Sequence, residues 1–285
     1  MIPKIIHFIY PWTEKTRPWS LVNTLAVRSA IKCYPDHKIM IWTNAPTRVP
    51  MLPVEKMKCD LPTHVGGVEI AWPQYVSDVM RLDILYEYGG IYMDTDIINL
   101  RPFTPLNENL LTISWEDKTM KSICNAFMIT PPGNLFVKTW LDHMPEAMES
   151  PIWAYGGVVL PKELALNPFL EDERSVIDHK LACPLDLQAN WMFDPKLKDA
   201  AKEKIADAYS VHVFETFWRD IIKDITPEWT EKNDCLFSEL FKKYQAQDTM
   251  MRPAPPAAGV PKFAGLDCVP AAPAMPTDKV MVDPA

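Results

Sequence analysis

Two aspartates separated by one residue are the part of the sequence best suited to chemistry. Asp94 and Asp96 follow a short apolar run, Ile91-Tyr92-Met93, which is typical of a strand. Side chains two positions apart on a strand point to the same side, so we expect both carboxylates to face one pocket. Paired carboxylate oxygens suit a hard divalent cation, Mn²⁺ or Mg²⁺, which commonly completes its shell with substrate phosphates. By itself the pair is a weak signal, because Asp-x-Asp is also common in solvated turns.

A second charged pair lies on the helix that we predict before this strand. Asp78 and Arg81 are three residues apart and therefore share one helix face. An arginine beside paired carboxylates can hold them in ion pairs, or donate hydrogen bonds to a phosphate or sugar oxygen. The helix is predicted over 74–88, with Ser77 near its start and Gly89-Gly90 as its stop. The sequence thus predicts four charged side chains around one pocket.

Strands and helices alternate along the rest of the chain. We predict strands at 5–10, 38–43, 91–93, 111–113, 127–130 and 209–214, and helices at 18–33, 74–88, 135–143 and 196–207, the first of these capped by Ser20. This alternation predicts an α/β domain with a mainly parallel central sheet flanked by helices. Ligands of such sheets usually bind beyond the carboxyl ends of the strands, which is where the two aspartates lie.

Composition and charge exclude several classes of protein. The chain has 285 residues, of which 48% are apolar and 23% charged, as is ordinary for a soluble globular protein. A net charge of −8 argues against a broad nucleic-acid-binding surface. No apolar run approaches the roughly 18 residues of a membrane span, and the N-terminus lacks the features of a cleaved signal. We therefore expect a cytoplasmic protein.

The composition changes once, near residue 250. Between Pro253 and Ala285 there are eight prolines and eight alanines. Such a segment buries too little apolar surface to offset its ordering entropy, so we predict a folded unit at 1–250 and a disordered tail at 251–285.

The six cysteines are scattered singly, without the spacing of a zinc site, and we interpret them as mostly buried thiols rather than disulfides.

The segment from Asp78 to Asp96 resembles the DXD-containing glycosyltransferase family, which includes initiating α-mannosyltransferases and capsular polysaccharide sugar transferases. It is also similar to the catalytic domain of the large glucosylating toxins. The family pattern is Asp-x-x-Arg followed by Gly-Gly-x-Tyr-x-Asp-x-Asp, and every spacing is kept here. Residues 2–10 are similar to the family's first strand, and Trp42-Thr43-Asn44 falls where the second strand ends in relatives. The resemblance is strong over 1–100, moderate to about 220 and absent in the tail.

The resemblance implies a GT-A-type nucleotide-sugar-binding domain and a retaining, metal-dependent hexosyltransferase. The donor would be a nucleoside diphosphate sugar, bound with Mn²⁺ or Mg²⁺, and the acceptor a hydroxyl group of a glycan, glycolipid or protein. By this analogy Asp96 would bind the metal directly, and Asp94 would contact it through water and also touch the ribose or sugar. Asp78 and Arg81 would hold the donor sugar's hydroxyls, with Tyr92 lining the same pocket.

Further site positions follow from the same resemblance. Tyr10 stands where relatives often place a Trp against the nucleobase, and its ring also offers a π-face. His212 to Trp218 resembles the family's His-x-x-x-x-Ser-Trp, so His212 would complete the metal shell and Trp218 would lie near the scissile phosphate–sugar bond. Phe217 replaces the usual Ser, and Glu215 is an extra candidate oxygen ligand. An ordinary strand-end histidine and a plain core tryptophan are the alternative interpretations.

Weaker features allow structural and functional interpretations. Asn125 matches a position that often faces the acceptor, and Gly156-Gly157 a small-residue turn that admits it, although turn and packing roles are favoured. His7 is interpreted as a core histidine with satisfied hydrogen bonds. The stretch 217–244 is compatible with peripheral membrane contact, but its mixed charge favours an ordinary amphipathic surface helix.

Two other functions compete with sugar transfer. A metal-dependent phosphohydrolase would use Asp94 and Asp96, but no nucleophilic Asp motif follows the first strand and no His-rich cluster is present. A non-catalytic nucleotide-sugar-binding protein would carry a decayed transferase site. The intact motif argues against decay, whereas Tyr10 and Phe217 keep that alternative open.

Overall fold

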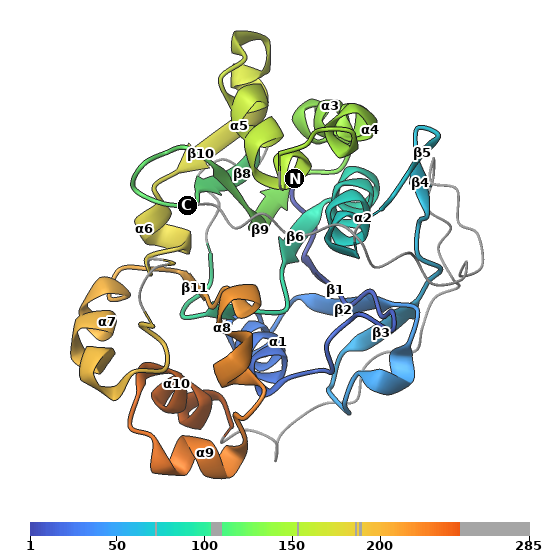
Figure 1. The fold of residues 1–285 in the computed structure, drawn as a ribbon. Helices are drawn as coiled ribbons and strands as arrows, with labels where there is room; N and C mark the ends of the chain where they lie inside the picture. The colour runs from blue at the N-terminus through green and yellow to red at the C-terminus, as the bar shows by residue number, and fades with distance from the viewer. Residues whose placement is uncertain (72, 104–109, 153, 186, 188–189, 246–285) are drawn as a thin grey trace.

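A computed structural model describes residues 1–245 apart from 72, 104–109, 153, 186, 188 and 189 (Figure 1). Its centre is a seven-stranded sheet in the order β10-β8-β9-β6-β1-β2-β3. These strands are β1 (Ile5–Ile9), β2 (Lys38–Thr43), β3 (Glu55–Lys58), β6 (Gly90–Met93), β8 (Leu111–Trp115), β9 (Ile123–Thr130) and β10 (Arg174–Ile177). Neighbouring strands are parallel except that β9 runs antiparallel to β6 and β8. The mainly parallel α/β architecture, which the resemblance implies for a GT-A-type domain, is confirmed.

Helices cover both faces of this sheet (Figure 1). One face packs against α2 (Pro73–Tyr88), α3 (Leu135–Asp142), α4 (Met144–Met148) and α5 (Leu160–Ala165), with the π-helix η2 (Tyr155–Val159) between α4 and α5. The other face packs against α1 (Leu21–Cys33) and α6 (His179–Ala182). Smaller elements are the hairpin of β4 (His64–Val65) and β5 (Val68–Glu69), and the short helices η1 (Pro46–Arg48), η3 (Pro168–Glu173) and η4 (Pro195–Leu197).

A third apolar cluster joins the C-terminal helices to α1. It is built by α7 (Lys198–Lys204), α8 (Glu215–Ile222), α9 (Pro227–Lys232) and α10 (Leu236–Gln245), around a two-stranded antiparallel sheet of β7 (Ile97–Asn99) and β11 (Ser210–His212). The prediction of one surface helix over 217–244 is wrong, because three helices occupy this stretch. The break before α9 has a local cause: Thr226 caps the helix and Pro227 occupies its first turn, a position where proline is favoured.

Two glycines let α2 lead directly into β6. Gly89 and Gly90 have φ of 61° and 100°, values that glycine adopts readily. A Cβ on Gly90 would lie 2.6 Å from the carbonyl oxygen of Ile5 on β1, so no larger residue fits. His7 Nε2 lies 2.9 Å from the carbonyl oxygen of Gly89, and Trp42 donates to His7 Nδ1 at 3.1 Å. His7 is fully buried with both ring nitrogens hydrogen-bonded, so the prediction of a satisfied core histidine is confirmed, and burial lowers its pKa to about 4.

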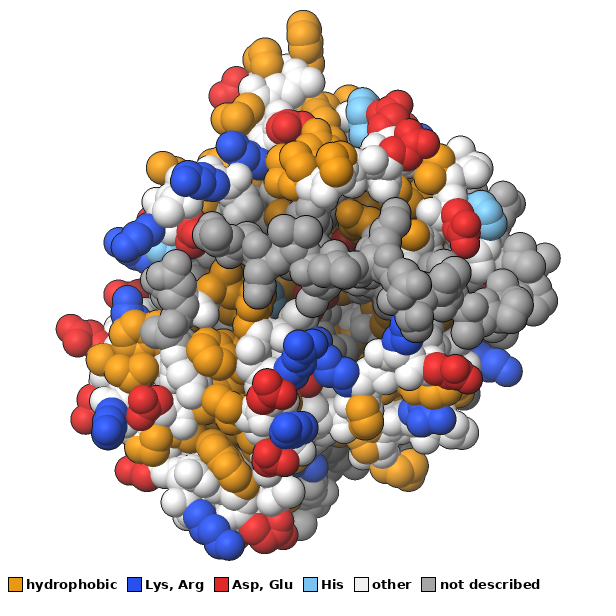
Figure 2. Space-filling view, viewed as in Figure 1, with side chains coloured by type: hydrophobic (Ala, Val, Ile, Leu, Met, Phe, Trp, Pro, Cys, Tyr) orange, Lys and Arg blue, Asp and Glu red, His pale blue; other side chains and the backbone are white. Residues whose placement is uncertain are grey.

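The surface and the cysteines agree with the expected composition of a globular domain. Figure 2 shows lysine, arginine and acidic side chains interspersed on one face, with hydrophobic side chains gathered over the α5 end. The five cysteines within the described ranges are buried, and none of these five is in a disulfide. Among the helices described, none combines the length and apolar character needed to span a bilayer. Cys268 and the predicted tail at 251–285 lie outside the described residues.

Candidate functional site

The Asp94–Asp96 segment lies at the carboxyl end of β6, in a turn. The expectation that strand alternation aligns the two carboxylates is wrong, because β6 ends at Met93 and the backbone N–H of Ile97 donates to the carbonyl of Asp94 at 3.0 Å. The turn nevertheless brings both carboxylates to one place. One ligand atom each from Asp94, Asp96 and His212 lie within 4.8 Å of one another. The predicted metal-ligand set is therefore assembled by a turn and by β11.

Asp96 and His212 form a buried pair. His212 Nε2 lies 3.4 Å from Asp96 Oδ1, and the backbone N–H of Glu215 donates to Asp96 Oδ2 at 2.8 Å. Burial opposes charge on both groups, but their mutual attraction outweighs it: the pKa of Asp96 is lowered and the pKa of His212 is raised well above its usual value. Without a cation the pair is a carboxylate and an imidazolium, so an ion that binds Nε2 must displace a proton.

The backbone conformation of Phe214 orients the N–H group that donates to Asp96. Phe214 has a φ of 55°, which is uncommon for a bulky residue, and its ring contacts the His212 ring at a tilt of 34°, with 3.8 Å between centroids. The left-handed residue ends the strand before 214 and starts α8, so that the N–H of Glu215 points at Asp96. The Glu215 carboxylate instead accepts from Asn23 Nδ2 at 2.8 Å. The extra oxygen ligand expected at Glu215 is therefore outside the three-residue ligand set described here.

Arg81 holds the acidic residues behind the turn. Arg81 is 4% exposed, and its guanidinium lies over the Tyr92 ring, with Cζ 4.6 Å from the ring centroid. Nη2 lies 3.1 Å from Asp78 Oδ1 and 3.4 Å from Asp94 Oδ1, and Nη1 donates to the carbonyl of Asn125 at 2.8 Å. Of the two roles that the sequence allows for Arg81, the structure displays the ion-paired one. A fixed guanidinium fork of this kind suits bidentate contacts with carboxylates.

Asp78 faces the π-helix. Asn125 Nδ2 donates to Asp78 Oδ1 at 2.8 Å, and burial raises the pKa of Asp78 to about 6 although Arg81 opposes the shift. Gly157 closes the same contact, because a Cβ there would lie 2.8 Å from Asn125 Nδ2 and 3.1 Å from Asp78 Oδ2. The turn predicted at 156–157 is thus a π-helix that packs on the Asp78 carboxyl, a feature frequent at functional sites.

Tyr92 and Tyr10, the two tyrosines predicted to line the donor pocket, are both buried. The Tyr92 side chain is fully buried, its hydroxyl donates to Asp94 Oδ1, and burial raises its pKa. It therefore positions Asp94. Tyr10 is 6% exposed and meets Trp19 edge-on, with 5.1 Å between ring centroids. Contact of either ring with sugar or nucleobase stays a prediction.

Trp218 lies on α8 beside His212. It is half-buried at a position where the helix geometry breaks, with φ of −105° and ψ of 16°. A small cavity next to it is lined by Leu185, Trp191, Met192, His212, Val213, Phe214 and Trp218. Trp218 therefore shares a cavity with His212, and its proximity to a scissile bond stays a prediction.

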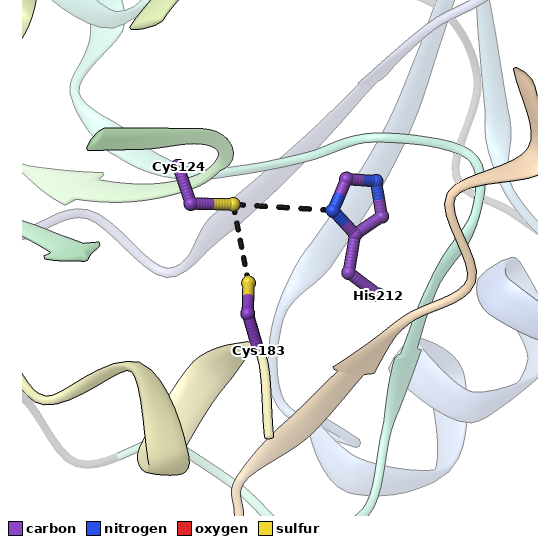
Figure 3. A group of neighbouring side chains, drawn as sticks. All are labelled: Cys124, Cys183 and His212. Atoms are coloured by element: carbon purple, nitrogen blue, oxygen red, sulfur yellow. Dashed lines mark hydrogen bonds between the residues drawn. The ribbon is translucent and has the colours of Figure 1, made fainter. Parts of the chain in front are cut away.

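Sequence reasoning missed several residues that build the site. Asn23 belongs to the capping box of α1, and its amide also donates to the carbonyl of Thr95 at 3.1 Å. The Ser20-x-x-Asn23 spacing signals the helix start but not this second contact. Cys124 Sγ lies 4.0 Å from His212 Nδ1 and 3.2 Å from Cys183 Sγ (Figure 3). These thiols lie far apart in the sequence, so no local spacing could reveal them.

Comparisons with known proteins find glycosyltransferases among the proteins that this chain resembles. Residues 22–112 match the family described as "Glycosyltransferase sugar-binding region containing DXD motif". The chain is 24% identical over 268 residues to Glucan organizing enzyme 1 of Cryptococcus neoformans, covering 86% of this chain and 71% of that protein. It is 31% identical over 147 residues to Inositol phosphoceramide mannosyltransferase 3 of Schizosaccharomyces pombe, covering 50% of this chain and 37% of that one. The solved structure of PaToxG Glycosyltransferase superposes with a TM-score of 0.47 and 16% identity, covering 85% of this chain and 87% of that chain.

The matched family segment contains most of the network described above. Asp78, Arg81, Tyr92, Asp94 and Asp96 lie inside residues 22–112, whereas the β11 histidine and the β1 tyrosine lie outside them. The chain spans 71% of the first relative but little more than a third, 37%, of the second. The relationship to DXD-containing glycosyltransferases that the motif predicts is confirmed.

Proposed function

We propose that this DXD-family glycosyltransferase moves a hexose from a nucleoside diphosphate sugar to a hydroxyl group of a glycan, glycolipid or protein, with a divalent cation held by Asp94, Asp96 and His212. One observation carries the proposal: ligand atoms of these three residues lie within 4.8 Å of one another. They lie just beyond β6, at the place where the order of the parallel strands reverses on either side of β1. Ligands of open α/β sheets bind at such a place.

The donor set favours Mn²⁺ over Mg²⁺. Two carboxylates suit either ion, but an imidazole nitrogen is a softer ligand and Mg²⁺ is usually bound by oxygen. When bound, the cation neutralises charge on the leaving diphosphate and fixes its orientation. Without such a cation the carboxylates of Asp94 and Asp96 would repel a negatively charged leaving group.

The chain's own residues position and enclose the reactants. Arg81 keeps the carboxylates of Asp78 and Asp94 in place through contacts of 3.1 and 3.4 Å. Asp78, backed by Asn125, binds the donor sugar's hydroxyls, and Trp218 lies on the His212 side of the bond that breaks. Because these groups are fixed before the donor binds, little reorganisation is required in the transition state.

The transfer proceeds with retention at the anomeric carbon. The bond from that carbon to the diphosphate oxygen breaks, and a bond to the acceptor oxygen forms on the same face of the sugar. The acceptor's proton moves to the leaving phosphate oxygen, so atoms and charges balance without a basic side chain. This course is proposed by analogy with the family that the Asp78–Asp96 motif resembles.

The test is donor hydrolysis by the purified full chain. It is incubated with Mn²⁺ and a panel of UDP- and GDP-sugars, and released nucleotide is measured for the wild type and for an Asp94→Ala/Asp96→Ala double variant. Asp220→Ala serves as the matched control, because that carboxylate is 89% exposed on α8. We expect slow hydrolysis of one donor by the wild type and the control, and a loss of at least about 100-fold in the double variant.

The same assay shows which outcomes would contradict the transferase proposal. Mn²⁺-dependent nucleotide binding without turnover, even when acceptor glycans are supplied, would support a non-catalytic binding protein. Phosphate release from simple esters would indicate a phosphohydrolase. Once an acceptor is found, the anomeric configuration of the product, read by nuclear magnetic resonance, decides whether retention is correct.

A further inference from the structure

A cluster of two thiols and one imidazole lies directly behind the proposed cation site. Cys124 is on β9, Cys183 follows α6, and His212 ends β11, so three distant parts of the chain meet here (Figure 3). Cys124 Sγ lies between the other two groups, 3.2 Å from Cys183 Sγ and 4.0 Å from His212 Nδ1. Both thiols are 2% exposed. One ligand atom from each of the three residues lie within 4.8 Å of one another.

The geometry of this cluster suits a thiophilic ion. Two thiolates and an imidazole are a ligand set that Zn²⁺ takes, with a fourth position left for water. Tetrahedral zinc with Zn–S of about 2.3 Å and Zn–N of about 2.0 Å separates its ligand atoms by roughly 3.5–3.8 Å. The observed separations of 3.2 and 4.0 Å bracket that range, so side-chain rotations of a few tenths of an ångström would suffice.

The second nitrogen of His212 is already oriented as a zinc ligand requires. Metal-binding histidines usually donate their other ring N–H to a carboxylate, which fixes the ring and its tautomer. Here Nε2 lies 3.4 Å from Asp96 Oδ1 while Nδ1 faces Cys124. Asp96, the imidazole and the thiol pair are therefore placed as in a carboxylate–histidine–metal arrangement, with the thiols on the side where the metal would bind.

We propose that Cys124, Cys183 and Nδ1 of His212 bind one Zn²⁺, and that this second site shares its imidazole with the cation site of the DXD turn. Binding replaces the two thiol protons and the Nδ1 proton of the imidazolium, all three of which pass to solvent, and no electron is transferred. An imidazole bound through Nδ1 carries its proton on Nε2 and donates it to Asp96. Zn²⁺ at the thiols therefore removes Nε2 from the ligands open to Mn²⁺. The zinc site stands by itself, whereas this competition rests on the proposed function.

Cobalt titration of the full chain tests the zinc site. The protein is reduced, stripped of metal and titrated with Co²⁺, and the thiolate-to-cobalt charge-transfer absorption is followed before Zn²⁺ is added to displace it. We expect one equivalent to bind with this absorption in the wild type. Cys183→Ser should lower the band at one equivalent of Co²⁺ to half or less, because one of two thiolates is lost, and weaken Zn²⁺ binding by more than the roughly 100-fold expected for loss of an outer-shell partner.

A matched cysteine variant separates ligand loss from general damage. Cys33→Ser removes a thiol that is 8% exposed at the end of α1, and this variant should keep the band. Circular dichroism checks that each variant is folded, and Cys183→Ala replaces Cys183→Ser where the hydroxyl disturbs packing. A wild type without the band, a band that is undiminished in both Cys183 variants, or a Cys124–Cys183 disulfide that persists under reducing conditions would each overturn the zinc site.

A second measurement tests the shared imidazole independently. Mn²⁺ binding is followed by electron paramagnetic resonance with and without one equivalent of Zn²⁺, and we expect Zn²⁺ to weaken it at least about 10-fold. Unchanged Mn²⁺ affinity would overturn the competition. Failure of the transferase proposal is distinguishable, because the thiolate band of the wild type is measured without a donor and does not depend on whether any donor is turned over.

Discussion

Asp94 is held in place by two buried neighbours, Tyr92 and Arg81. The hydroxyl of Tyr92 donates to Asp94 Oδ1, and Arg81 Nη2 lies 3.4 Å from the same oxygen. Tyr92 is fully buried, whereas the Asp94 side chain is 27% exposed. One oxygen of this carboxylate is therefore satisfied from the protein side, and the carboxylate presents its other side to the site.

Removing one hydroxyl tests this support at the scale of a single residue. We expect Tyr92→Phe to weaken Mn²⁺ binding about 10-fold, since it removes an outer-shell partner, and to lower the free energy of unfolding by about 1 kcal/mol. Mn²⁺ titration and urea denaturation measure the two effects. Tyr88→Phe is the control, because Tyr88 packs through its ring, 5.7 Å from Trp42. Equal Mn²⁺ affinity in both variants would contradict a positioning role for Tyr92.

The raised pKa of His212 predicts a pH dependence of metal binding. Nε2 must lose its proton to bind a cation, and Asp96 holds that proton to higher pH than in a free histidine, against the effect of burial. Mn²⁺ affinity should therefore fall as pH falls from 8 to 6, by up to about tenfold per unit. Isothermal titration at several pH values measures the slope, and His212→Asn should flatten it. A wild-type slope that matches the variant would refute the role of Nε2.

The same pair predicts a stability change in the metal-free protein. A histidine whose folded pKa is raised contributes stability that is complete below its unfolded pKa, near 6.5, and is lost as pH rises through the folded value. The lowered pKa of Asp96 contributes stability above its unfolded value, which is lost as pH falls. Between those limits the ion pair stabilises the fold, which is why removing the cation should not unfold the site.

At the scale of elements, local signals decided what the sequence could predict. The capping box at Ser20 and the Gly89-Gly90 stop act within one turn of chain, so α1, α2 and β6 could be placed from the sequence. The reversed direction of β9 could not, because strand direction depends on pairing between distant segments. The π-helix at 155–159 was also missed: Gly157 lies against Asn125 and Asp78, and contacts with such distant residues leave no local signal in the sequence.

The residues of the candidate site also fall into two groups, those that local sequence predicts and those that it does not. Asp78 to Asp96 is contiguous in sequence, and its spacing alone predicts a shared pocket. His212 could be assigned only by resemblance, and nothing local indicates that its Nδ1 faces Cys124, 88 residues away in sequence. Phe214 is a further example, because a left-handed phenylalanine has no sequence signature.

The π-helix provides a test at the element scale. Gly157→Ala would place a methyl group 2.8 Å from Asn125 Nδ2 and 3.1 Å from Asp78 Oδ2. We expect the Asp78–Asn125 hydrogen bond to break and donor turnover to fall at least about 10-fold. Gly156→Ala is the control, because its methyl group would meet the flexible Met144 side chain at 3.1 Å. Nucleotide release under the conditions of the donor assay measures both, and equal turnover would show that η2 does not set the position of Asp78.

At the scale of the whole molecule, the site joins segments from distant parts of the sequence. Asn23 lies at the start of α1, Thr95 in the turn after β6, and Glu215 at the start of α8. The Asn23 amide donates to the Thr95 carbonyl at 3.1 Å and to Glu215 Oε2 at 2.8 Å, while its oxygen accepts from the backbone of Ser20 at 2.8 Å. One buried amide therefore links the start of α1, the turn after β6 and the start of α8 beside the proposed cation site.

A pair of buried caps tests this coupling. Asn134 also caps a helix, accepting from the backbone N–H of Val137 at 3.1 Å, and its amide donates to the carbonyl of Glu173 at 3.0 Å, but it belongs to α3. We expect Asn23→Ala and Asn134→Ala each to lower the free energy of unfolding by about 1–2 kcal/mol, measured by urea denaturation. Asn23→Ala should in addition weaken Mn²⁺ binding several-fold, since the turn and α8 lose their common partner. If both variants bind Mn²⁺ like the wild type, the turn is positioned by β6 and Arg81 without help from α1, and the site is more local than this network implies.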